Sequence, residues 1–130
     1  MSEENVEIVR RAFAFKVQGR GDPAAAPTDF DPGVVLTSVE AGTSYGRDAV
    51  RANFERWTSA WAESEATAEE FIDAGDRVVV SAHFRARGRG SGIEVEARFH
   101  EVYTLRGGKI VRVDEFSDRA DALGAAGVRE

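Results

Sequence analysis

The chain has 130 residues, of which 42% are hydrophobic and 31% are charged, a mixture typical of one globular domain and too apolar for a disordered chain. There is no cysteine, which excludes disulfides, thiolate metal sites and cysteine nucleophiles. The net charge of −6 opposes nucleic-acid binding, because phosphate contacts need a concentrated positive surface. No apolar run approaches the ~20 residues of a membrane span, and the chain opens acidic, so a cytoplasmic protein without membrane contact is expected.

The first half of the sequence predicts two long helices separated by a loop and a strand. Apolar residues at helical spacing predict a helix over about residues 3–17. Glycines and prolines in 19–33 predict a loop with at most one helical turn, and the β-branched segment 34–40 predicts a strand. A second helix is expected over 47–61. Its apolar face contains Val50, Phe54, Trp57 and Trp61.

The second half changes to the two-residue period of β-strands. Four strands are predicted, within 65–75, 76–88, 91–106 and 109–118, joined by glycine-containing turns as in an antiparallel meander. Residues 119–127 read as a weak helix or a tail. These elements predict a single α+β domain over residues 1–130, with the helices gathered on one face of a curved sheet.

The last predicted hairpin raises the possibility of a polar site. If Leu105 pairs with Ile110 across the two-glycine turn, strict alternation places His100 opposite Glu115. Both faces of this hairpin carry large apolar side chains, so periodicity alone does not choose the buried face.

Several segments resemble the SnoaL-like polyketide cyclases of the nuclear transport factor 2-like superfamily, which also includes ketosteroid isomerase and limonene epoxide hydrolase. These segments are "VRRAFAF", "SYGRDAVRANFERW", "FIDAGDRVVV" and "YTLRGGKIVRVDEFSDRADAL". The resemblance spans nearly the whole chain. It implies a cone-shaped α+β barrel, in which a strongly curved antiparallel sheet packs on N-terminal helices around a pocket. It also implies a homodimer formed through the outer face of the sheet, expected here to include Phe99, Tyr103, Ile110 and Phe116.

The same resemblance implies three catalytic candidates. Glu115 lies near the last-strand position of the catalytic aspartate in the SnoaL cyclase, and His100 lies where ketosteroid isomerase has its oxyanion-hole aspartate. The neighbouring strand would add His83 to the pocket. We therefore expect Glu115 as base, His100 as its partner or as an oxyanion donor, and His83 as a further polar contact. The alternative is an ion pair between His100 and Glu115 without any turnover.

The expected ligand is a hydrophobic small molecule, because the candidate pocket is rich in aromatic residues. The candidate lining is Phe13, Tyr45, Phe54, Trp57, Trp61, Ser81, Val102 and Val113. Plain core packing is the alternative for each aromatic residue. Ketosteroid isomerase has a tyrosine where this chain has Phe13, so steroid isomerisation by that mechanism is not expected.

Two function classes therefore remain open. The first is a ligand-binding enzyme with isomerase, cyclase or hydratase chemistry, and the second is a non-catalytic dimeric binding or accessory domain. No metal and no cofactor are expected, because the two histidines and Glu115 lack the spacing of a ligand set. Arg85, Arg87 and Arg89 lack the interleaved aromatic residues that RNA binding needs, so no nucleic-acid partner is expected.

Overall fold

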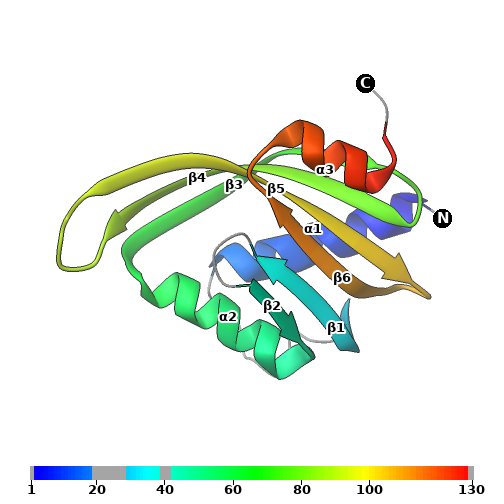
Figure 1. Cartoon of the computed structure of the whole chain (residues 1–130), viewed down its shortest axis with the longest axis horizontal. Helices are drawn as coiled ribbons and strands as arrows, with labels where there is room; N and C mark the ends of the chain where they lie inside the picture. The colour runs from blue at the N-terminus through cyan, green and yellow to red at the C-terminus, as the bar shows by residue number, and fades with distance from the viewer. Residues whose placement is uncertain (1, 19–28, 39–41, 129–130) are drawn as a thin grey trace.

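The computed structural model describes residues 2–18, 29–38 and 42–128, which form three helices and six strands (Figure 1). In chain order these elements are α1 (Ser2–Gln18), β1 (Phe30–Ser38), β2 (Gly42–Tyr45), α2 (Arg47–Ser59), β3 (Trp61–Asp73), β4 (Arg77–Gly88), β5 (Glu94–Arg106), β6 (Lys109–Phe116) and α3 (Arg119–Ala126). The α+β class is confirmed. Within the described residues no helix has both the length and the apolar character needed to cross a membrane.

All six strands belong to one sheet in the order β2-β1-β6-β5-β4-β3. The last four strands form the predicted antiparallel meander. The sequence does not reveal that β1 returns to pair in parallel with β6, which makes the sheet mixed. This pairing brings together residues 77 positions apart, as in the hydrogen bond from Thr37 to Asp114.

Helices cover both faces of the sheet. The inner face is defined here as the one packed on α1 and α2, where Phe13 and Val50 share a core with Val80. The outer face carries α3, whose Leu123 shares a second core with Val102. Figure 1 shows α3 and α1 on opposite sides of the strands. The expectation that the helices gather on one face is therefore wrong for α3.

The boundary between the second helix and the strand that follows it also differs from the prediction. The helix predicted over 47–61 ends at Ser59, and Trp61 instead begins β3 by pairing with Gly88. The Arg89 guanidinium donates to the Ser59 carbonyl at 3.1 Å, a favourable interaction for a cation at a helix C-terminus. The two tryptophans therefore lie on different elements.

At the start of the sheet, β1 begins at Phe30, inside the segment predicted as a loop. The short strand β2 replaces a predicted turn, because its residues pair with β1. The remainder of the predicted loop, residues 19–28, and the end of the first predicted strand, residues 39–40, lie outside the described residues.

A β-bulge changes the register of the last hairpin. Leu105 pairs with Ile110 as predicted, but Thr104 then pairs with Arg112, so Val111 is an extra residue on β6. A shift of one residue changes which side chains are cross-strand partners at every position beyond the bulge. Glu115 consequently lies opposite Glu101, and His100 lies opposite Phe116. The predicted pairing of His100 with Glu115 is wrong.

Candidate ligand site on the inner face

Two carboxyl side chains lie on adjacent strands at the inner face. Glu101 of β5 and Glu115 of β6 are direct cross-strand partners, and so are Tyr103 and Val113, two positions along each strand. Tyr103 and Val113 belong to the core under α1, which assigns all four residues to the inner face. Glu101 is 0% exposed, whereas Glu115 is half-buried.

Each of the two carboxyl groups accepts a hydrogen bond from a hydroxyl group. The Tyr103 hydroxyl donates to Glu101 Oε1 at 3.0 Å, and the Ser38 hydroxyl donates to Glu115 Oε1 at 3.2 Å. Burial raises the pKa of Tyr103 well above its ordinary value, and the nearby negative charges of Glu101 and Glu115 raise it further. Tyr103 therefore stays protonated and remains a donor to Glu101.

Aromatic side chains flank this polar row. Phe13 of α1 packs against Phe71 and Phe99, with ring centroids 6.4 Å apart in both contacts. A second group joins Trp57 and Trp61 to Phe84, with centroids 5.0 Å and 5.6 Å from the Phe84 ring. Trp57 remains 38% exposed. The inner face thus combines aromatic side chains, of which Phe13 and Phe84 are buried and Trp57 is partly exposed, with a small set of polar groups. Ligand sites commonly combine apolar and polar groups in this way.

Both histidines lie on the outer face instead. Ser81 Oγ is hydrogen bonded to His100 Nδ1 at 2.8 Å, and His83 Nε2 contacts Glu96 Oε1 at 3.0 Å. Val102 packs there against α3. The expected pocket positions of His100, His83, Ser81 and Val102 are therefore wrong. The residues of β4 and β5 that face α1 are the alternating set opposite to the predicted one.

The environment of His100 favours its neutral form. Burial lowers the pKa of His100, and the positive charge of Arg119 lowers it further, against a smaller opposing effect of Asp118. Arg119 is itself held by Glu70, with Nη2 and Oε1 3.1 Å apart. His100 is thus a buried polar residue beneath α3 and is not a group that faces the inner site.

The remaining candidates divide between the two faces. Phe13 and Val113 are buried in the inner core, and Glu115 is on the inner face as expected. Tyr45 is 72% exposed and pairs with Val35 on the opposite side of the sheet from Leu36, so its expected pocket position is wrong. The side chain of Phe54 lies outside what the structure describes.

Three residues of the inner-face site were not predicted from the sequence, namely Glu101, Tyr103 and Ser38. A signal for the first two is present, because an acidic residue interrupts the alternating run Phe99, Tyr103 and Leu105 at a position that shares their face. A carboxyl at such a position is buried with the apolar side chains on either side, and buried charged groups are rare unless they have partners.

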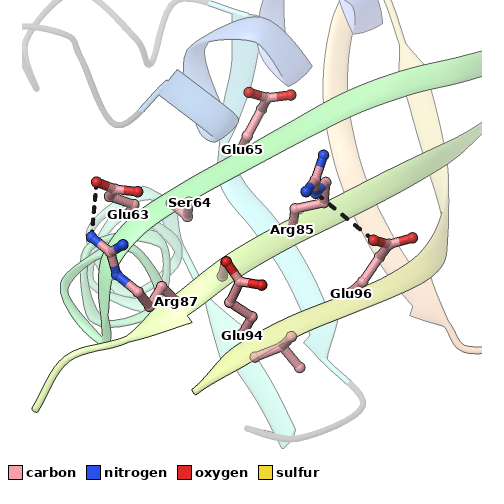
Figure 2. A pocket seen from close by; sticks show the side chains of 9 residues that line it. Glu63, Ser64, Glu65, Arg85, Arg87, Glu94 and Glu96 are labelled. Carbon is pink, nitrogen blue, oxygen red and sulfur yellow. Dashed lines mark ion pairs between the residues drawn. The ribbon is translucent and has the colours of Figure 1, made fainter. Parts of the chain in front are cut away.

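A hollow of about 350 Å³ lies elsewhere, at the projecting ends of β3, β4 and β5. Figure 2 shows that charged side chains dominate its lining, with ion pairs between Glu63 and Arg87 and between Arg85 and Glu96. None of the predicted site residues lines this hollow. Across the described part of the chain, no group of three or more histidine, aspartate or glutamate side chains is arranged to hold a metal ion.

Comparison with known proteins identifies the class. Residues 9–113 match the SnoaL-like domain, and the chain belongs to this family. A nuclear transport factor 2-like protein from Burkholderia thailandensis E264 is 30% identical, with a TM-score of 0.76 and coverage of 91% of this chain and 95% of that one. No curated protein matches the chain.

Two further structures share the fold at lower identity. TerC, co-crystallised with polyporic acid, is 21% identical, with a TM-score of 0.75 and coverage of 95% of this chain and 98% of that one. A protein with a ketosteroid isomerase-like fold from Catenulispora acidiphila, in complex with trimethylamine, is 20% identical, with a TM-score of 0.74 and coverage of 95% and 94%. Both of these related structures were obtained with a small molecule.

Proposed function

We propose that this protein binds an apolar small molecule at the inner face and that Glu115 acts as a base in an isomerisation, cyclisation or hydration. The observation that carries the proposal is the position of Glu115 on the inner face, half-buried and opposite the fully buried Glu101. The use of small molecules in two structures of the same fold, polyporic acid with one and trimethylamine with the other, supports a ligand-binding role.

Each inner-face group has a distinct role in this proposal. Glu115 accepts a proton from the ligand, because it is the carboxyl that keeps some exposure. Ser38 orients Glu115 through its hydrogen bond, and Tyr103 orients Glu101 in the same way. The partly buried Phe99, which packs on the buried Phe13, provides the apolar ring for a flat ligand. His100, on the outer face, has no part in this proposal.

The test combines ligand capture with a variant that removes only the basic group. Purified protein is incubated with a metabolite pool, and retained and altered compounds are identified by mass spectrometry. We expect the wild type to retain and convert an apolar compound, and Glu115→Gln to retain it while losing at least 100-fold in conversion rate. Glu96→Gln, a carboxyl change on the outer face, serves as the matched control. Full conversion by Glu115→Gln would contradict the role of Glu115.

A non-catalytic binding or accessory domain is the second candidate. It is favoured by the hydrogen bonds of Tyr103 and Ser38, which direct these hydroxyl groups to the two carboxyls. In that case wild type and Glu115→Gln would retain the same compound, and neither would convert it.

We further propose a homodimer that forms through the outer face, in a cytoplasmic protein. The residues expected for that interface need correction, because Phe99, Tyr103 and Ile110 belong to the inner core and only Phe116 packs with the outer one. Sedimentation at micromolar concentration tests the proposal, and a monomeric mass would contradict it.

A further inference from the structure

We propose that α3 is a cover on the outer face of the sheet that acid releases, with His100 as the group whose protonation drives the release. The cover lies on the face opposite to the proposed ligand site, so it does not depend on the proposed reaction. It adds a response to pH, which neither the family membership nor the proposed function specifies.

The attachment of α3 to the sheet is small. The helix has 8 residues, of which three are buried. Leu123 packs there with Val79 and Val102 of the sheet. Isolated helices shorter than about 12–15 residues are marginal in water, so α3 depends on this contact to remain helical. Release from the sheet therefore also melts the helix and opens its backbone hydrogen bonds.

A buried polar pair continues the surface beneath α3. Ser81 and His100 follow Val79 and Val102 at the two-residue spacing that keeps them on the same face of β4 and β5. Ser81 is 6% exposed and His100 is 7% exposed, and Ser81 Oγ lies 2.8 Å from His100 Nδ1. On β6 the partner of His100 is the apolar Phe116. A proton added to His100 would thus place a charge where water has little access, which is costly.

Charged groups of α3, β3 and β5 surround this pair. Arg119 and Asp118 lie at the start of α3, and Arg119 contacts Glu70 of β3 at 3.1 Å. Arg98 of β5 contacts Glu69 of β3 at 2.9 Å. Asp118 accepts the backbone N–H groups that cap α3. The carboxylates near His100 are therefore engaged with other partners.

These surroundings favour the neutral form of His100. Burial is the largest cause that lowers the pKa of His100, and the positive charge of Arg119 is the next. Asp118 and Glu70 each oppose this shift by less, and Arg98 adds slightly to it. The two main causes both depend on α3, because the helix covers the imidazole and carries Arg119.

Release of α3 removes these two causes together. Water then reaches the imidazole, and the pKa of His100 returns toward its ordinary value of 6.5. The released form therefore takes up a proton more readily than the packed form. One proton taken up on release raises the released fraction by up to about tenfold per pH unit. The rise begins as the pH falls below 6.5 and ends once His100 is also protonated in the packed form.

The experiment measures hydrogen exchange of backbone amides in the full chain by NMR, from pH 7.5 to pH 5.5. Rates are divided by the intrinsic exchange rate at each pH. We expect the α3 amides to be at least about tenfold less protected than those of the buried Val79 and Val80, because α3 opens separately. Protection of α3 should fall by about threefold or more across this pH range.

Two variants identify the titrating group. His100→Asn keeps a polar group near Ser81 and takes up no proton in this range, so its α3 protection should not change with pH. His83→Gln is the matched control, because His83 lies on the same face of β4 and contacts Glu96 instead. This variant should keep the decrease seen in the wild type.

Each outcome supports or overturns the proposal. In the wild type, α3 amides as strongly protected as those of β4 would overturn separate release. Protection of α3 that does not change with pH, or that falls equally in His100→Asn, would overturn the role of His100. If His100→Asn does not fold, NMR titration of the His100 ring in the wild type decides. A midpoint below pH 6.5 is expected, and a midpoint at or above it would overturn the proposal.

Discussion

Tyr103 illustrates how a single buried hydroxyl defines the inner face. Its ring belongs to the core under α1, while its hydroxyl donates to Glu101 in a place that water does not reach. Loss of one partner of such a buried hydrogen bond removes part of the compensation for burying the other, which costs free energy. The interaction therefore matters for folding as well as for the proposed site.

We predict that Tyr103→Phe lowers the free energy of unfolding by about 1–3 kcal/mol, because the Glu101 carboxyl loses a buried donor. Tyr45→Phe removes the same atom from a residue that is 72% exposed and should change stability very little. Urea unfolding of both variants gives the comparison. Equal stability losses in the two variants would contradict the assignment.

A second residue-scale prediction concerns acid. Burial lowers the folded-state pKa of His100 below its ordinary value of 6.5, so the unfolded chain takes up a proton first as the pH falls. The contribution of neutral His100 to stability is complete above pH 6.5 and is lost as the pH falls from there through the folded pKa. His100→Gln should show a smaller stability loss between pH 7 and pH 5, measured by urea unfolding at each pH. Identical pH profiles would refute this prediction.

At the scale of elements, α3 is a short helix with defined ends. Asp118 caps it by accepting the Ala120 backbone N–H at 2.7 Å, and Gly127 closes it with a φ of 77°. Leu123 and Ala126 bury its apolar side on the outer face of the sheet. Local signals thus set where the helix begins and ends, and the sheet supplies the surface on which it packs.

The two glycines of α3 should respond oppositely to alanine. Gly124 lies within the helix with nothing within 4 Å of an added Cβ, so Gly124→Ala should stabilise the fold by roughly 0.5–1 kcal/mol. Gly127 has the left-handed conformation, so Gly127→Ala should destabilise it by about 1 kcal/mol. Thermal unfolding of both variants measures the signs. The same sign in both would contradict the cap geometry.

The whole molecule is connected by pairings that are distant in sequence. The parallel pairing of β1 with β6 joins the first strand to the last, and the bond from Ser38 to Glu115 spans this junction. Because β6 also completes the meander, the N-terminal and C-terminal halves share one sheet. We therefore propose that residues 1–130 form one cooperative domain.

This proposal predicts a single unfolding transition. Fluorescence of Trp57 and Trp61 reports on the junction of α2 with β3, whereas far-ultraviolet circular dichroism reports on the whole chain. The two signals should give the same midpoint in urea, as expected for a two-state domain. Two separated midpoints would indicate independently folding parts.

The sequence by itself determined the class of the fold, the four strands of the meander, the two long helices and the family resemblance. These features follow from local periodicity and turn residues, which act over a few positions. It also indicated Glu115 as an inner-face carboxyl, through the resemblance.

Only the tertiary structure decided which residues share the site. The extra residue Val111 moves Glu115 from His100 to Glu101, and the packing of α1 selects the alternating set that contains Tyr103. The physical reason is that a two-residue period leaves two equivalent faces, and a single bulge exchanges the cross-strand partners beyond it. The choice is made by contacts between segments far apart in the chain, which local sequence does not encode.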